Sequence, residues 1–261
     1  MSRPEYLKNL SENHKIIGIT GTHGKTSTTA LLSHIFHFNN VNVSYLYGGI
    51  TTFNGIGGHY GDPDQPLILE TDEAFNTFEK IKISDLLVLN VDSDHLDYFK
   101  NLDNYKDAFY KVMKNVTDNL VINNDDLNIK SMKELKNPVS YGKDISADFK
   151  VQSPGTFIYE NNKYEIKSDI IGDHFKANML GAIILALLNG IEIKDSLNAI
   201  ESFAGVKRRI ELIGISKGVL IYDDYGHHPT EMEATITALK QQTESKLYVV
   251  FQPHRYTRTM E

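Results

Sequence analysis

The residues best suited to chemistry follow an apolar run near the N-terminus. The run Ile16–Thr20 is followed by Gly21, Gly24, Lys25 and Thr26. This order predicts a buried strand, a phosphate-binding loop and the start of a helix. Glycines let backbone N–H groups surround phosphate oxygens, and the N-terminus of the following helix adds partial positive charge. We expect Lys25 to reach the outer phosphates of a nucleotide and the Thr26 hydroxyl to bind magnesium.

The spacing of this loop differs from that of the common nucleotide-binding loop. The common pattern places a glycine five positions before Gly24, where this chain has Ile19. The match is instead to a shorter Gly-Thr-His-Gly-Lys-Thr sequence at residues 21–26. Such a turn can also be a plain connection between a strand and a helix, but the apolar periodicity on both sides favours the phosphate loop.

Polar residues follow two further apolar runs. Residues 67–70 end in Glu70, close to Asp72 and Glu73, and residues 86–91 are followed by Asp92, Asp94, His95 and Asp97. Strands buried on both faces indicate a parallel sheet, whose ligands collect at the carboxyl ends of the strands. Glu70, the Thr26 hydroxyl and nucleotide oxygens suit magnesium, and His95 is a less usual partner. The alternative is that both acidic groups are solvated turns and that His95 caps a helix.

Three segments nearer the C-terminus carry candidate ligands. Arg208 and Arg209 can bridge to phosphate at a domain hinge or form an ordinary surface pair. Residues 223–231, Asp-Asp-Tyr-Gly-His-His-Pro-Thr-Glu, form a turn between a strand and a helix. Neighbouring side chains on a turn diverge, so we expect a ribose or substrate contact there rather than zinc. The arginines of residues 252–258 suit a carboxylate or phosphate, or belong to a basic loop.

The composition excludes several classes of protein. A chain of 261 residues with 41% hydrophobic residues is long enough for two globular units. The net charge of −7 argues against a nucleic-acid binder. The absence of cysteine excludes disulfides and thiolate metal sites, and a chain without disulfides suits the reducing cytoplasm. Residues 1–14 lack the apolar core of a signal peptide, and the apolar stretch 179–188 is too short to insert in a membrane.

The hydrophobic pattern predicts an α/β fold with a mostly parallel sheet and helices on both faces, followed by a partial Rossmann-like domain. We expect an ATP-binding domain at 1–204 and the start of a second domain at 205–261. Helices are expected at 4–13, after the phosphate loop, and at 105–116, 125–135, 172–189, 194–202 and 229–241. Strands are expected at 14–20, 41–47, 67–70, 86–91, 120–123, 209–213, 219–223 and 247–252, with antiparallel hairpins at 148–167 and a long glycine-rich loop after residue 47.

Six motifs occur in the same order as in a known family. They are Gly21–Thr26, Glu70–Glu73, Asp94–Asp97, Gly205–Arg209, Asp223–Glu231 and Phe251–Tyr256. Together they span nearly the whole chain, and the series is far more specific than any one motif. The chain therefore resembles the Mur ligases, and among them those that add L-alanine to UDP-N-acetylmuramate in peptidoglycan synthesis.

The resemblance implies ATP-dependent amide formation through an acyl phosphate, with ATP and Mg²⁺ as cofactors. It places Lys25 on the ATP phosphates, Thr26 and Glu70 on magnesium, and His95 on a second magnesium or the transferring phosphate. The other positions that it implies for the nucleotide are Gly21, Thr22, His23, Gly24 and Ser27 in the loop, Asn178 on adenine, Arg209 on the phosphates and Asp224 on the ribose. It places His227, His228 and Arg255 near the amino acid or muramyl substrate.

The chain departs from the family pattern at three places. His174 is followed by Phe175 where the family has asparagine, so one polar contact near the base is replaced. We expect the N-terminal UDP-binding domain to be absent from this chain, or supplied elsewhere, and the C-terminal domain to be incomplete. Three alternatives stay open: a ligase of the same family that attaches a whole peptide, a non-catalytic nucleotide-binding module, and an ordinary nucleotide hydrolase.

Overall fold

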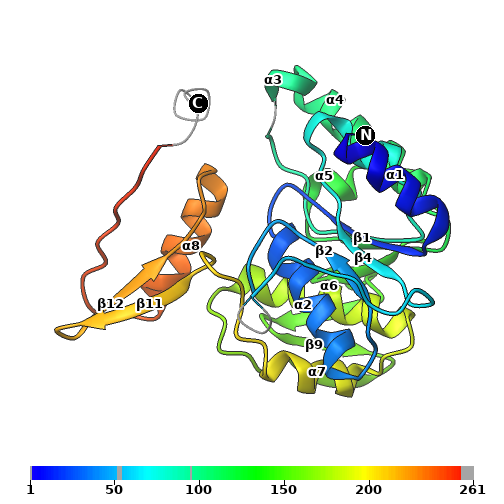
Figure 1. Ribbon diagram of the computed structural model, residues 1–261. Helices are drawn as coiled ribbons and strands as arrows, with labels where there is room; N and C mark the ends of the chain where they lie inside the picture. The colour runs from blue at the N-terminus through cyan, green and yellow to red at the C-terminus, as the bar shows by residue number, and fades with distance from the viewer. Residues whose placement is uncertain (1, 52–54, 95, 254–261) are drawn as a thin grey trace.

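The computed structural model describes residues 2–51, 55–94 and 96–253, and it contains a large sheet unit and a smaller C-terminal unit (Figure 1). The large sheet has ten strands in the order β10-β9-β8-β7-β6-β5-β1-β4-β2-β3. In this order, every neighbouring pair from β8 to β2 is parallel. The pairs β2–β3, β8–β9 and β9–β10 are antiparallel. The mostly parallel sheet and the antiparallel hairpins at one edge are as predicted. The strands are β1 Ile16–Thr20, β2 Ser44–Leu46, β3 Gly58–His59, β4 Leu67–Glu70, β5 Asp85–Val88, β6 Asn119–Asn123, β7 Val139–Gly142, β8 Phe149–Ser153, β9 Thr156–Tyr159 and β10 Asn162–Glu165.

Helices cover both faces of this sheet, and each face has its own core. Ile17 and Ile19 of β1 belong to the core that includes α2, α6 and α7, whereas Ile16 belongs to the core that includes α1 and α4. This division follows from the alternation of side chains along a strand, and it explains why the strands are apolar throughout. The helices are α1 Arg3–Asn13, α2 Lys25–Phe38, α3 Leu96–Phe99, α4 Leu102–Lys114, α5 Leu127–Lys130, α6 Asp173–Leu188 and α7 Ile193–Glu201, with 3-10 turns η1 Ala74–Asn76 and η2 Phe78–Lys80. None of the described helices is long and apolar enough to cross a bilayer.

The position of β1 decides where the candidate residues meet. β1 lies between β4 and β5 and is parallel to both. The loops that follow these three strands therefore leave the sheet at the same edge. They carry the phosphate loop, the group around Glu70 and the group around Asp92.

Two elements between residues 125 and 142 differ from the prediction. The helix expected at 125–135 is shorter and consists of α5 alone. Asp126 caps its start by accepting a 2.9 Å hydrogen bond from Ile129 N. The chain leaves the helix soon after, and Glu134 has a φ of +63°. The sequence did not predict β7, a short strand in which the polar Ser140 obscures the apolar pattern. Buried Tyr141 is its clearest sheet-forming residue.

The C-terminal unit consists of β11 Glu211–Ser216, β12 Val219–Asp223 and α8 Pro229–Gln241. The two strands form an antiparallel pair of their own. The buried strand expected at 247–252 is wrong: the segment has no strand pairing, and Tyr248 and Val250 are 80% and 99% exposed. Apolar composition favours a strand, but a strand needs a neighbour for its backbone hydrogen bonds, and none is placed beside this segment in the described structure. The domain boundary expected near residue 205 stays a prediction.

Candidate active site

The phosphate loop connects β1 to α2 in a conformation that requires glycine. Gly21 and Gly24 have φ values of +142° and +85°. A Cβ atom on Gly24 would lie 2.4 Å from Asn178 Nδ2, so the loop and α6 approach too closely there for a side chain. Gly24 is also the N-cap of α2. The backbone amides at the start of α2 thus lie at the loop, which is the arrangement that binds phosphate.

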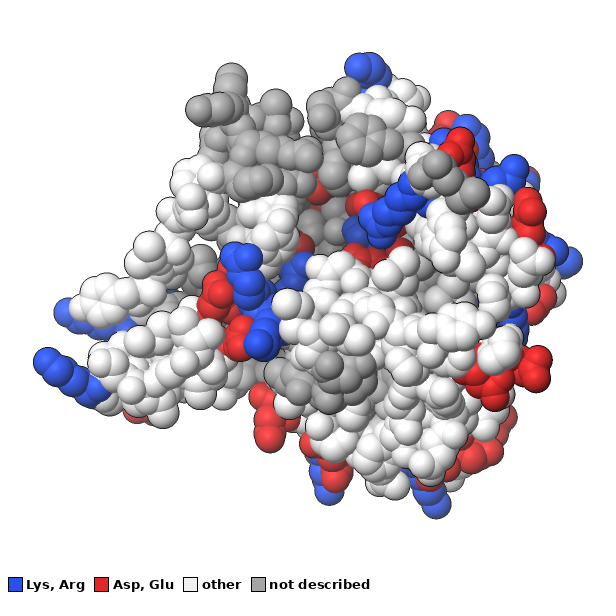
Figure 2. Space-filling model, in the orientation of Figure 1, with Lys and Arg blue, Asp and Glu red and all other residues white. Residues whose placement is uncertain are grey.

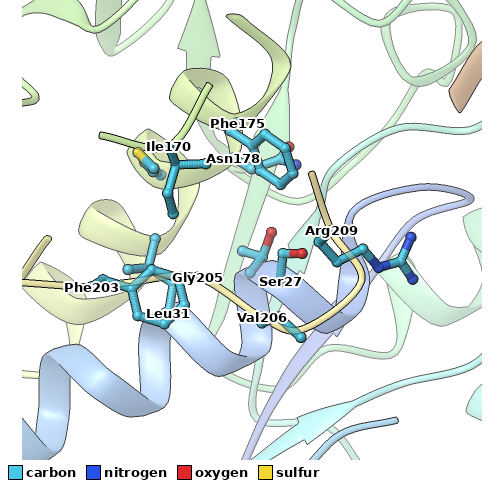
Figure 3. A pocket seen from close by; sticks show the side chains of 11 residues that line it. Ser27, Leu31, Ile170, Phe175, Asn178, Phe203, Gly205, Val206 and Arg209 are labelled. Atoms are coloured by element: carbon cyan, nitrogen blue, oxygen red, sulfur yellow. The ribbon is translucent and has the colours of Figure 1, made fainter. Parts of the chain in front are cut away.

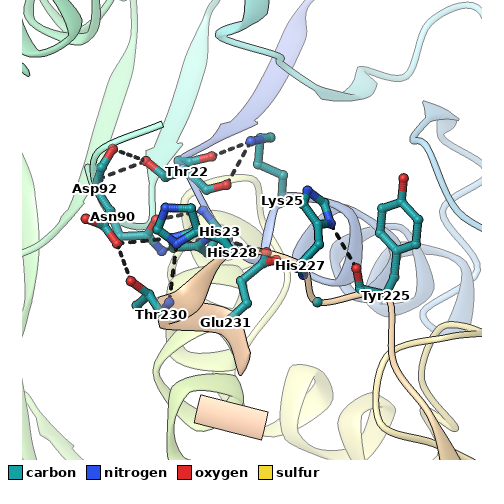
Figure 4. Close-up of polar contacts among 12 residues, drawn as sticks. Thr22, His23, Lys25, Asn90, Asp92, Tyr225, His227, His228, Thr230 and Glu231 are labelled. Carbon is teal, nitrogen blue, oxygen red and sulfur yellow. Dashed lines mark hydrogen bonds and ion pairs between the residues drawn. The ribbon is translucent and has the colours of Figure 1, made fainter. Parts of the chain in front are cut away.

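Lys25 folds back over the loop and is held by a buried carboxylate. Its Nζ donates to Gly21 O at 2.6 Å, to Thr22 O at 3.2 Å and to Glu73 Oε1 at 2.9 Å. The Glu73 side chain is only 1% exposed. Burial would lower the pKa of Lys25, but the charge and hydrogen bond of Glu73, together with the charges of Asp72 and Glu70, outweigh it, and the pKa lies above its ordinary value. Lys25 is therefore a fixed cation at the loop (Figure 4).

Thr26 and Glu70 meet as the sequence predicted. The Thr26 hydroxyl donates to Glu70 Oε1 at 2.9 Å, and Gly48 N donates to the other oxygen, Oε2, at 2.6 Å. One hydroxyl and one carboxylate oxygen, next to a loop suited to phosphate, form the donor set that Mg²⁺ prefers. The residues present fit a magnesium ion shared between the protein and nucleotide phosphates.

The end of β5 holds the other side of the loop. The Asn90 side chain bonds both backbone groups of His23. It accepts from His23 N at 2.8 Å and donates to His23 O at 3.0 Å. The Thr22 hydroxyl accepts from Asp92 N at 2.8 Å and lies 3.0 Å from the Tyr105 hydroxyl. These contacts fix the path of the loop before any ligand binds. Sequence reasoning gave Asn90 no role, although its signal is a polar residue at the end of an apolar run.

The start of α8 contacts the phosphate loop directly (Figure 4). The Thr230 hydroxyl donates to Asp92 Oδ2 at 2.7 Å, and Glu231 Oε1 lies 3.2 Å from His23 Nδ1. Burial would raise the pKa of Glu231, but the hydrogen bond and charge of His23, with Arg209, hold this pKa at about 2. His228 Nε2 lies 2.9 Å from Ser93 O. Two hydrogen bonds thus join the C-terminal unit to the segment after β5, and the Glu231–His23 contact joins it to the phosphate loop.

A cavity of about 400 Å³ lies between the two units. Figure 2 shows acidic and basic side chains in the hollow where the units face each other. The cavity brings together residues predicted from distant motifs: His23, Gly24, Ser27, Asn178, Arg209 and Asp224. Figure 3 shows a second, more apolar pocket, and Ser27, Phe175, Asn178 and Arg209 line both it and the cavity. The arrangement suits a ligand with phosphates at the loop and an apolar ring near Phe175.

Arg209 and Asp224 have protein partners in this structure. Arg209 Nη1 lies 4.0 Å from Glu231 Oε1. Asp224 accepts from Ile210 N at 2.8 Å and from Gly226 N at 2.7 Å, which orients its carboxylate at the cavity wall. The roles of both residues toward a nucleotide stay predictions.

Two of the predicted substrate residues, His227 and His228, do not line this cavity. His227 Nδ1 lies 3.0 Å from Tyr225 O, and this histidine does not line the cavity. His228 contacts the phosphate loop instead of lining the cavity. His95 and Arg255 lie outside the described residues. Two acidic residues make contacts that the sequence did not predict. Glu73 pairs with Lys25, and Glu231 pairs with His23.

Comparison with known proteins gives two family matches. Residues 19–186 match the Mur ligase middle domain, and residues 208–260 match the Mur ligase glutamate ligase domain. The chain is 39% identical over 275 residues to a UDP-N-acetylmuramate–L-alanine ligase of Clostridium botulinum, covering 100% of this chain and 60% of that protein. A protein of the same name from Dictyoglomus turgidum is 36% identical, covering 99% of this chain and 58% of that protein. The chain thus spans about 60% of the length of these relatives.

Solved structures give the same picture. A UDP-N-acetylmuramate-alanine ligase from Thermotoga maritima superposes with a TM-score of 0.79 at 26% identity, covering 93% of this chain and 58% of that one. A murein peptide ligase from Psychrobacter arcticus superposes with a TM-score of 0.71 at 23% identity, covering 94% of this chain and 59% of that one. The second likeness concerns the fold alone.

Proposed function

This chain belongs to the Mur ligase family, and from that premise we propose that it is part of an ATP-dependent ligase that joins L-alanine to UDP-N-acetylmuramate in peptidoglycan synthesis, in the cytoplasm. The single observation that carries the proposal is the meeting of Thr26 and Glu70, 2.9 Å apart, beside a phosphate loop that holds Lys25. The likeness to relatives of that name supports the choice of substrates.

The proposed reaction has two stages. An oxygen of the muramyl carboxylate attacks the γ-phosphorus of ATP, the bond from that phosphorus to the bridging oxygen breaks, and ADP leaves. The amine of alanine then attacks the acyl phosphate carbon, the tetrahedral intermediate expels inorganic phosphate, and the amine loses a proton. Negative charge moves from the carboxylate to the leaving β-phosphate in the first stage, and it develops on the carbonyl oxygen and then on the leaving phosphate in the second. The protein therefore acts mainly by positioning the reactants and by stabilising that charge.

Each part of the loop has a role in this scheme. The backbone amides at the start of α2 would bind the phosphates, and Lys25, held at the loop by Glu73, would neutralise charge on the transferring phosphoryl group. Thr26 and Glu70 would hold magnesium, which neutralises charge on the phosphate oxygens when it is bound. His95 is proposed to act there too. Because Glu73 already holds Lys25 at the loop, little reorganisation is needed when the phosphates arrive.

The cavity between the units is the proposed place of the nucleoside. Asn178 would contact the base beside Phe175, Asp224 the ribose and Arg209 the phosphates; all four residues line the same cavity. We propose that residues 1–204 form the ATP-binding domain and that residues 205–261 begin the ligase domain. His227, His228 and Arg255 are proposed to face the amino acid or muramyl substrate.

Calorimetric titration with ATP and Mg²⁺ tests the nucleotide part of the proposal. Replacing Lys25 with alanine removes the cation at the loop, and we expect binding to weaken by about tenfold or more, since a charged hydrogen bond contributes roughly 1.5–3 kcal/mol. Lys111→Ala is the matched control, because Lys111 is exposed on α4. Equal binding by wild type and Lys25→Ala would show that the loop role is wrong.

Phosphate release tests the substrates. We expect any phosphate release from ATP to require both UDP-N-acetylmuramate and L-alanine. Release with a tripeptide in place of alanine would point to the peptide-attaching ligase, and release without the muramyl substrate to a hydrolase. ATP binding without any release would favour the nucleotide-binding module and contradict ligase activity of this chain.

A further inference from the structure

Three potential metal ligands converge where α8 meets the phosphate loop. His23 comes from the loop, Asp92 from the segment after β5, and His228 from the N-cap of α8. One ligand atom from each side chain lies within 4.8 Å of the other two, and all three side chains are half-buried. The rings of His23 and His228 have centroids 4.7 Å apart (Figure 4). Residues from three separate elements, and not neighbours on one turn, form this cluster.

The spacing of the first two ligands suits a tetrahedral ion. His23 Nε2 and Asp92 Oδ2 are 3.2 Å apart. Two ligand atoms at about 2.1 Å from zinc, at a tetrahedral angle, are about 3.4 Å apart. An ion can therefore enter between these two atoms with a small movement of either side chain.

A neighbouring carboxylate already orients one of the two histidines as a metal site requires. Glu231 Oε1 lies 3.2 Å from His23 Nδ1, which leaves Nε2 to face Asp92. A histidine ligand whose other ring nitrogen donates to a carboxylate is the usual arrangement around zinc, and His23 has it. His228 Nε2 lies 2.9 Å from Ser93 O, and Nδ1 accepts from Thr230 N at 3.3 Å, so an ion that binds His228 replaces one of these two contacts. The cluster is thus supported on its outer side at His23.

We propose that His23, Asp92 and His228 bind a transition-metal dication, Zn²⁺ by ligand chemistry, at a site distinct from the magnesium ligands Thr26 and Glu70. Imidazole ligands select zinc and similar ions, whereas magnesium takes oxygen ligands. Three protein ligands leave a fourth position open for water or another small ligand. The bound ion ties the phosphate loop to the first turn of α8.

Titration of the metal-free chain with ZnCl₂, in a calorimeter and without nucleotide, tests the site. We expect one strong site that excess Mg²⁺ does not displace, and a tetrahedral absorption spectrum when Co²⁺ replaces zinc. Losing even a residue that supports a ligand costs about 10-fold to 100-fold in metal affinity. We therefore expect His23→Gln and His228→Gln each to weaken zinc binding by at least about tenfold.

Two control variants separate this site from its neighbours. His227→Gln changes the adjacent histidine, which contacts Tyr225 O and is not part of the cluster. Glu70→Gln removes the magnesium ligand. Both are expected to bind zinc within about twofold of wild type, which is the ordinary scatter for a residue outside the site.

Several outcomes would overturn the proposal. One is zinc affinity that His23→Gln and His228→Gln leave unchanged, since the ion would then sit on other histidines. Another is an equal loss in His227→Gln, or a loss confined to Glu70→Gln. Circular dichroism and melting curves in EDTA check that each variant is folded. Asp92→Asn provides a third ligand variant if either histidine variant unfolds, and unchanged affinity there also contradicts the site.

Discussion

Replacing Glu73 with glutamine tests whether the buried pair with Lys25 stabilises the phosphate loop. Both carboxylate oxygens of Glu73 lie 2.9 Å from Lys25 Nζ. The side chains of Glu73 and Lys25 are 1% and 12% exposed, so solvent screens this pair poorly. The substitution keeps the shape of the side chain and removes its charge. It therefore leaves the Lys25 ammonium buried without a counter-charge.

The expected loss of stability is about 2–3 kcal/mol. Breaking a buried ion pair by removing one partner costs roughly 3–5 kcal/mol, because the other charge stays buried. Here Lys25 keeps its bonds to Gly21 O at 2.6 Å and Thr22 O at 3.2 Å, and the glutamine oxygen can still accept, so the expected loss lies at or just below the lower end of that range. For a protein of this size, that loss lowers the melting temperature by about 5–10 °C.

Urea denaturation at pH 7, followed by circular dichroism, measures the free energy of unfolding. Glu79→Gln is the matched control, since Glu79 is an exposed glutamate on the neighbouring turn and is expected to change stability by less than about 0.5 kcal/mol. If Glu73→Gln loses no more than this control does, the pair does not stabilise the loop and the reasoning is refuted.

Three further predictions concern the loop and the cavity. Gly24→Ala should lower the free energy of unfolding by roughly 1–3 kcal/mol, because φ is +85° and the new Cβ would lie 2.4 Å from Asn178 Nδ2; urea curves that coincide with wild type would contradict this. The pKa of Glu231 is about 2, lowered from 4.5, so its contribution to stability is present above about pH 4.5 and is lost as the pH falls toward 2. Stability should therefore fall more steeply over that range in wild type than in Glu231→Gln, and parallel curves would show that the lowered pKa is wrong. Phe175→Ala should weaken ATP binding in calorimetry by roughly 1–3 kcal/mol if the base stacks on its ring, whereas Phe251→Ala, at an exposed phenylalanine, should not; equal binding by both variants would remove Phe175 from the base site.

The part of the site that the sequence predicted is local or depends on simple sheet geometry. The phosphate loop is a contiguous strand, loop and helix, so its glycines and Lys25 could be recognised without knowing the fold. The meeting of Thr26 and Glu70 follows once both strands are parallel and buried, because their carboxyl ends then share one edge. The predicted fold class is confirmed for the same reason.

The part that the sequence missed depends on contacts between distant segments. Glu73 was open to interpretation as loop surface, and the structure buries it against Lys25, which is 48 positions away in the chain. The contacts of His228 with Ser93 O and with the ring of His23 were likewise not predicted. Neither contact leaves a local pattern in the residue types. The error at residues 247–252 has a related cause, since apolar residues favour a strand but cannot supply its partner.

The sequence by itself determined the strand, loop and helix around the phosphate loop and the residue types that the loop presents. Hydrophobic periodicity and glycine positions are properties of neighbouring residues. Only the tertiary structure decided which charges are paired and which side chains share the cavity. Those pairings depend on the placement of β1 between β4 and β5 and on the contact of Glu231 of α8 with His23 of the loop. Such placements are set by the packing of whole elements, and packing joins residues whose separation along the chain carries no signal of their distance in space.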